Sequence, residues 1–112
     1  MTQNPYARKN EHGVFEKEQC EEIRKDGDRW NVQIRIAHVD ENDFRYGCSC
    51  QVRHGGFGYA PSENSKPYPT RELALLAASA ELMHGILKSY SDEEEHKQAV
   101  AWLRTLLQPS LF

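Results

Sequence analysis

The sequence predicts an α+β domain, in which a small antiparallel sheet packs against a long helix and a further helix follows toward the C-terminus. Two segments in which apolar and polar residues alternate, 30–36 and 44–52, predict neighbouring strands of that sheet. Segment 71–88 has apolar residues over more than half of its helical circumference, which predicts the long helix. The chain has 112 residues, a length typical of one domain.

The N-terminal residues 1–12 show no hydrophobic period, so we expect a flexible tail ahead of a single domain over residues 13–112. Segment 14–25 has Phe15, Gln19 and Ile23 at helical spacing and is rich in Glu, Lys and Gln, which favours a helix. The Asp26-Gly27 pair that follows is typical of a hairpin turn. A helix over 14–25 is therefore the prediction, and a strand over 21–25 stays open as the alternative.

Alternation assigns each residue of the two clear strands to one face of the sheet. The even-numbered positions are apolar, and they are Trp30, Val32, Ile34, Ile36, Phe44, Tyr46, Cys48, Cys50 and Val52. The acidic run 40–43 between the strands predicts a tight turn, which makes them antiparallel. Gly55-Gly56 and Gly58 predict a short further strand over 57–60 or a bent continuation of the second strand, and Pro61 limits it. We expect about three strands, with room for a fourth.

Two helices are predicted after a loop over 62–69. Thr70 is placed to cap the first, 71–88, and its two apolar stripes imply contact with the sheet on one side and with another helix on the other. A capping box from Ser91 to Glu94 predicts the start of the second helix, over 92–107, and Pro109 follows its end. The predicted core comprises Trp30, Val32, Ile34, Ile36, Tyr46, Cys48, Cys50, Val52, Leu73, Leu76, Ala77, Ala80, Leu87, Val100 and Leu103.

Two stretches resemble RNA-binding families. The run Gly56 to Ala60 is similar to the base-stacking strand of RNA-recognition motifs, but in that family a helix separates the first two strands, whereas a tight turn joins them here. Residues 14–88 resemble the double-stranded-RNA-binding domain in their order of helix, three strands and helix. Gly56 and Gly58 match the G-x-G of its last strand, and 73–82 matches its alanine-rich helix. The paired lysines of that helix have no match, so the resemblance implies the layout and assigns no RNA-binding residue.

The composition excludes several classes of protein. The longest nearly apolar stretch, 73–80, is far shorter than the about 20 residues of a membrane helix, so we expect no membrane partner. The N-terminus is polar and has no hydrophobic segment behind it, and three cysteines are an odd, sparse set, so we expect reduced thiols and cytoplasmic residence. The net charge is −3, which argues against general attraction to nucleic acid but leaves local patches open.

No catalytic residue, metal or cofactor is predicted. Cys48 and Cys50, with His38 and His54 nearby, would be chemically suitable zinc ligands, but alternation places both cysteines on the core side of the sheet. The chain contains no phosphate-binding glycine loop, recognisable nucleophile motif or convincing carboxylate pair. We therefore expect a binding protein and not an enzyme.

The odd-numbered face of the sheet carries arginines without acids on its strand positions. Arginines there could hold phosphates by bidentate hydrogen bonds, while Phe57 and Tyr59 stack on bases, which predicts binding of DNA or RNA. Arginine stems also commonly cover exposed strands and pair with neighbouring acids, so a purely structural role stays open. The residues predicted for nucleic-acid binding are Arg29, Arg35, Arg45, Arg53, Phe57 and Tyr59.

A protein-binding role is the alternative. The acidic start of the second helix, with Glu93, Glu94 and Glu95, would imitate phosphates. An adaptor or inhibitor of this kind, such as a phage or plasmid accessory protein, would block a nucleic-acid-processing enzyme. The wide apolar arc of the long helix also leaves room for a homodimer.

Overall fold

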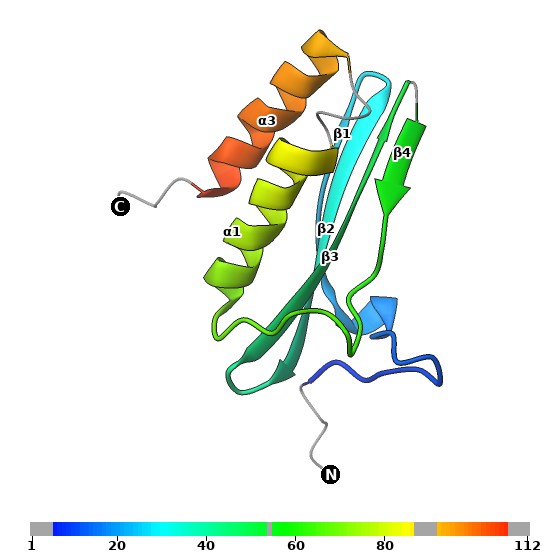
Figure 1. Cartoon of the computed structure of the whole chain (residues 1–112), viewed down its shortest axis with the longest axis vertical. Coiled ribbons are helices and arrows are strands. Elements are labelled where there is room, and N and C mark those ends of the chain that lie inside the picture. The colour runs from blue at the N-terminus through cyan, green and yellow to red at the C-terminus, as the bar shows by residue number, and fades with distance from the viewer. Residues whose placement is uncertain (1–5, 54, 87–91, 108–112) are drawn as a thin grey trace.

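The computed structural model of the chain describes residues 6–53, 55–86 and 92–107. These residues form a four-stranded antiparallel sheet followed by two helices, and both helices pack against the same face of the sheet (Figure 1). The strands follow the chain in the order β1-β2-β3-β4, and the α+β class is confirmed. Their bounds are β1 Glu21–Gly27, β2 Trp30–Asp40, β3 Asp43–Val52 and β4 Gly55–Gly58.

The helices follow the sheet in the chain. Helix α1 spans Arg71–Glu81 and continues as a π-helix, η2, over Leu82–Ile86, and α3 spans Glu93–Leu107. A short 3-10 helix, η1, spans Lys17–Gln19 before the sheet. None of the described helices is long and apolar enough to cross a membrane.

The predicted helix over 14–25 is wrong, and the alternative of a strand is confirmed. Strand β1 pairs with β2 along its whole length, from Glu21 opposite Ile36 to Gly27 opposite Trp30. The tight turn falls at residues 28–29, where Arg29 has a positive φ of 65°, and not at Asp26-Gly27. Pairing with an apolar neighbour strand therefore overrode helix propensity. Four strands precede both helices, so the layout lacks the first helix of the double-stranded-RNA-binding domain.

The core lies between the sheet and the two helices. The even-numbered strand residues Trp30, Val32, Ile34, Ile36, Cys48 and Cys50 are buried there, as alternation predicts. Tyr46 and Val52 are partly buried and pack against them. From the helices the core receives Ala74, Leu75, Ala78, Leu82, Ala99 and Leu103.

The predicted sheet-facing stripe of α1 is partly wrong. Leu73 and Leu76 are 44% and 50% exposed, whereas Leu75 and Leu82 are buried. The buried stripe includes Ala74, Ala78 and Ser79, and small side chains allow a close approach between helix and sheet. Leu87 lies outside the described residues, as do Ser91 and His54.

We expect Leu73→Gln and Leu76→Gln each to change the free energy of unfolding by less than about 0.5 kcal/mol, because both side chains are largely exposed and glutamine keeps the helix propensity. Urea denaturation measures this change. A loss of about 2 kcal/mol or more would instead show that the side chain is buried in solution, for example against a second copy of the chain.

Both helix starts are capped by side chains. Thr70 accepts a hydrogen bond from the Leu73 N–H at 3.2 Å, as predicted. At α3, Asp92 accepts from the Glu95 N–H at 2.8 Å, and the Glu95 carboxylate accepts from the Asp92 N–H at 3.3 Å. The capping box therefore lies one residue later than predicted. It fixes Glu95, which is only 7% exposed, beneath the start of α3.

Candidate nucleic-acid interface

The sheet face opposite the helices carries the odd-numbered residues of β2 and β3 and the even-numbered residues of β1, because Arg24 pairs with Gln33 and Gln33 pairs with Ser49. We call it the open face. One half of this face is covered by the N-terminal segment: Ala7 and Phe15 pack on Ala37, and the Ala7 N–H donates to the His38 carbonyl at 2.8 Å. The other half, toward residues 31, 51 and 53, is exposed.

A groove of about 820 Å³ runs along the exposed half. It is bordered on one side by Gly55, Gly56 and Gly58 of β4, which place no side chains over it. Among the described residues that line the groove, two are arginines and none carries a carboxylate. Its polar side chains are Arg24, Asn31, Gln33, Ser49, Gln51 and Arg53.

The neutral polar side chains in the groove hold one another only loosely. The Asn31 amide donates to Gln51 at 3.5 Å, and the Ser49 hydroxyl donates to Gln33 at 3.4 Å. Both distances lie beyond the usual range for such hydrogen bonds. A ligand could therefore replace these two bonds at little cost. The Gln33 amide also donates to Glu22, so Asn31, Ser49 and Gln51 are the side chains most available for hydrogen bonding.

The two groove arginines differ in their partners. Arg24 forms an ion pair with Asp26 at 2.9 Å, but both side chains are more than half exposed, and such a pair contributes little. The Arg53 guanidinium has no ion-pair partner in the part of the chain that the structure describes, and only its backbone N–H donates to Glu95, at 3.4 Å. Arg53 is therefore the more available cation of the groove.

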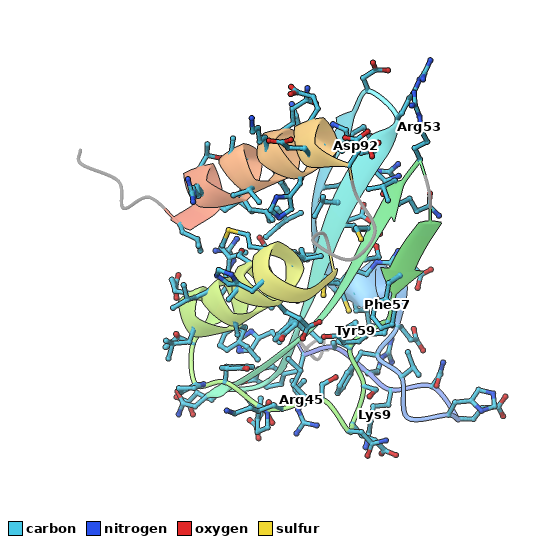
Figure 2. All side chains as sticks on the ribbon, turned by 45° about the horizontal axis from the view of Figure 1, so that its top comes forward. Lys9, Arg45, Arg53, Phe57, Tyr59 and Asp92 are labelled. Atoms are coloured by element: carbon cyan, nitrogen blue, oxygen red, sulfur yellow. The ribbon has the colours of Figure 1, made fainter. Side chains whose placement is uncertain are left out.

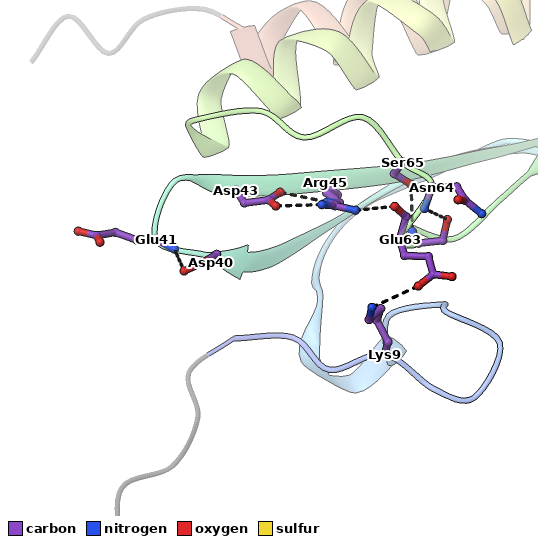
Figure 3. Close-up of polar contacts among 9 residues, drawn as sticks. Lys9, Asp40, Glu41, Asp43, Arg45, Glu63, Asn64 and Ser65 are labelled. Atoms are coloured by element: carbon purple, nitrogen blue, oxygen red, sulfur yellow. Dashed lines mark hydrogen bonds and ion pairs between the residues drawn. The ribbon is translucent and has the colours of Figure 1, made fainter.

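Of the other predicted arginines, Arg29 and Arg45 do not line the groove, and Arg35 lines the compartment next to it. Arg45 donates to both carboxylate oxygens of Asp43 at 3.0 Å and to the Glu63 carbonyl at 2.7 Å, so its charge is matched (Figure 3). These bonds to Asp43 raise the pKa of its guanidinium. Arg29 lies with Arg53 at a hollow of about 190 Å³ that is also lined by Asp28, Asp92, Glu94 and Glu95. Figure 2 shows Arg53 and Arg45 at opposite ends of the molecule.

Phe57 and Tyr59 are not on the open face. Phe57 lies opposite Cys50, whose side chain points toward the helices, and alternation gives Phe57 the same side. Tyr59 reaches Glu81 of α1 with its hydroxyl, at 2.6 Å. The two rings contact each other edge to face, with centroids 6.0 Å apart. Phe57 is among the residues that line the groove, but its pairing with Cys50 turns its ring toward the helix side, so neither predicted stacking ring faces the groove arginines.

Glu81 is a polar centre that sequence reasoning missed. Its carboxylate accepts hydrogen bonds from Tyr46 at 2.8 Å, from Tyr59 at 2.6 Å and from the Cys48 thiol at 3.1 Å. Burial would raise the pKa of Glu81, but the three hydrogen bonds outweigh burial and hold the pKa below its ordinary value. Burial, and then the bond to Glu81, raise the pKa of Cys48, which disfavours the nucleophilic thiolate.

Arg24 is the groove residue that the sequence did not reveal, because 14–25 was expected to be helical. In a strand at this position, alternation would have placed Arg24 on the open face. Of the predicted acidic set, Glu93 and Glu94 are exposed, and Glu95 is the buried cap. Within the described ranges, no three His, Cys, Asp or Glu side chains gather as a metal site requires.

Comparison with models of known protein families, with curated proteins and with solved structures finds no match for this chain.

Proposed function

We propose that this protein is a non-enzymatic module that binds single-stranded DNA or RNA in the groove of the open face. The observation that carries the proposal is the lining: Arg24 and Arg53 together with four neutral hydrogen-bonding side chains, and no carboxylate among the described lining residues. Arginine recognises phosphate by paired hydrogen bonds, and amide and hydroxyl side chains recognise base edges. An anionic ligand would supply the ion-pair partner that Arg53 lacks among the described residues, and a neutral or cationic ligand would not.

A single strand suits this groove better than a duplex. Bases of single strands are unstacked and turn toward sheet surfaces, where side chains reach their hydrogen-bonding edges. Asn31, Gln33, Ser49 and Gln51 stand in two adjacent rows on β2 and β3, so they offer such contacts along the groove. Phe57 and Tyr59 lie on the other side of the sheet, so binding here depends on charge and hydrogen bonds and not on aromatic stacking.

The proposal is tested by fluorescence anisotropy with labelled single-stranded DNA and RNA at a series of salt concentrations. We expect the Arg24→Ala/Arg53→Ala double variant to bind about tenfold more weakly at low salt. We also expect its slope of log affinity against log salt to fall by about 1.4, because each phosphate contact with a single strand contributes about 0.7. Both arginines are exposed, so the fold should persist.

Arg104→Ala is the matched control, since Arg104 is an exposed arginine on α3, away from the groove lining. It should bind as the unaltered protein does. The proposal would be contradicted if the Arg24→Ala/Arg53→Ala variant bound as tightly as the unaltered protein. It would also be contradicted if the unaltered protein bound neither DNA nor RNA even at low salt. In that event the acidic start of α3 becomes the next candidate binding surface. The Glu93→Gln/Glu94→Gln variant then tests an adaptor or inhibitor role.

A further inference from the structure

The groove is open at one end and closed at the other. Along β3 it passes Arg53, Gln51 and Ser49 and then reaches Gly47. A Cβ atom on Gly47 would lie 2.3 Å from the Tyr59 carbonyl oxygen and 2.6 Å from backbone atoms of Ala60 and Pro61. The backbone of residues 59–61 therefore crosses directly over Gly47 on the open face. We call this crossing the cover.

The cover is fixed to the rest of the fold by several contacts. The Phe15 N–H donates to the Pro61 carbonyl at 3.0 Å, and the Glu63 N–H donates to the Gly13 carbonyl at 2.8 Å. Glu63 also pairs with Lys9 at 3.2 Å, and its carbonyl accepts from Arg45 (Figure 3). On the neighbouring strand β2, the packing of Phe15 on Ala37 closes the same end. A polymer lying in the groove cannot continue past this end.

A second compartment, of about 260 Å³, lies just before the cover. It shares Gln33, Ser49 and Gly58 with the groove and adds Arg35, Gly47, Cys48, Tyr59 and Ala60. Arg35 is the only cation among its described lining residues. The Arg35 Nε is buried and has no hydrogen-bond acceptor within the described part of the chain.

The surroundings of Arg35 leave its charge incompletely matched. The nearest carboxylate is Glu22, with its Oε1 3.8 Å from Nε, beyond hydrogen-bond distance. Glu22 already accepts a hydrogen bond from the Gln33 amide. The Arg35 Nη2 donates only a long bond of 3.5 Å, to the side-chain amide oxygen Oε1 of Gln33. A guanidinium with an unused buried N–H is suited to an anion with several oxygens.

We infer that the groove takes the end of a nucleic-acid strand and that Arg35 holds its terminal phosphate. The inference rests on the proposed function and names the part of the polymer that is recognised. An internal phosphodiester must continue in both directions, which the cover prevents. A terminal phosphate carries a charge of about −1.5 to −2 and three free oxygens, so it matches one guanidinium in the compartment beside the cover.

The distances along the groove agree with a short bound segment. Arg53 follows the end of β3 and lies six residue steps from Gly47, which corresponds to about 20 Å of extended chain. That length accommodates about four nucleotides. Arg53 and Arg24 then hold internal phosphates near the open end, while Arg35 holds the terminal one at the cover.

The test is competition anisotropy with four unlabelled forms of one oligonucleotide: 5′-phosphorylated, 3′-phosphorylated, unphosphorylated and covalently closed into a circle. We expect one phosphorylated form to bind about tenfold more tightly than the unphosphorylated strand, and the circle to bind most weakly. The preferred form identifies the strand polarity in the groove. Equal affinity of the circle and of both phosphorylated strands would overturn end recognition while leaving the groove as the binding site.

Two variants tie the preference to Arg35. Arg35→Gln should bind phosphorylated and unphosphorylated strands equally. Glu22→Gln removes the neighbouring negative charge on an exposed strand position and should tighten binding of the phosphorylated strand about threefold. If Arg35→Gln fails to fold, Glu22→Gln is sufficient as the test. A preference for the phosphorylated strand that Glu22→Gln leaves unchanged would contradict the role of Arg35 in holding the terminal phosphate. Binding of peptides with a free carboxyl end, and of no oligonucleotide, would overturn both proposals.

Discussion

Replacing Gly47 with alanine is expected to lower the free energy of unfolding by about 3 kcal/mol. The backbone φ of Gly47 is not positive, so alanine can adopt it, and the cost comes from contact alone. The new Cβ would overlap the backbone of Tyr59, Ala60 and Pro61, and backbone atoms cannot turn aside as a side chain can. The cover would have to move off β3, with loss of its hydrogen bonds to Cys48 and Phe15.

Urea denaturation followed by circular dichroism measures this effect. Gln51→Ala is the control, because it places alanine on the same strand and the same face without a covering segment, and it should change stability by less than about 0.5 kcal/mol. A Gly47→Ala variant as stable as the Gln51→Ala variant would show that residues 59–61 do not lie on the sheet. The closed end of the groove would then be absent as well.

The two central strands were predictable because burial of one face imposes strict alternation. Strand β1 was not, because its only apolar side chain in contact with the core is Ile23, and charged residues surround it. An edge strand pairs on one side only and is typically protected by charge, so it carries little hydrophobic period. The spacing of Phe15, Gln19 and Ile23 matched a helix by coincidence.

The choice between the two stripes of α1 depended on packing that the sequence does not encode locally. Either stripe satisfied the helical period, and the predicted core used the one with Leu73 and Leu76. The stripe that includes Ala74 and Ala78 faces the sheet, because these small side chains let the helix approach the sheet closely.

Alternation placed Arg35 and the groove side chains of β2 and β3 on the open face. It could not show that Arg45 is matched by Asp43 and covered by the loop of Glu63, because Arg45 and Glu63 are separated by 18 residues in the chain. The bond from Tyr46 to Glu81 spans 35 residues. Contacts between residues so far apart in the sequence depend on the tertiary fold. The alternation of residues along a strand does not determine that fold.

Glu81→Ala is expected to lower the free energy of unfolding by about 2 kcal/mol. The substitution leaves the hydroxyl groups of Tyr46 and Tyr59 and the thiol of Cys48 without their shared acceptor. Hydrogen bonds to a charged group contribute about 1.5–3 kcal/mol each where water is excluded, and less here because Tyr59 can bond to water. Glu81→Gln keeps one acceptor oxygen and the shape of the side chain, so it should cost about half as much.

The pH dependence separates the charge of Glu81 from its packing. Because the folded pKa of Glu81 lies below its ordinary value of 4.5, its contribution is complete above that value and is lost as pH falls through the folded pKa. Glu81→Gln should therefore lose less stability than the unaltered protein on acidification from neutral pH. Glu21, whose pKa is lowered by its hydrogen bonds to Arg71, keeps some acid sensitivity in both proteins. Parallel stability curves for the two would contradict an ionised Glu81 at the centre of this cluster.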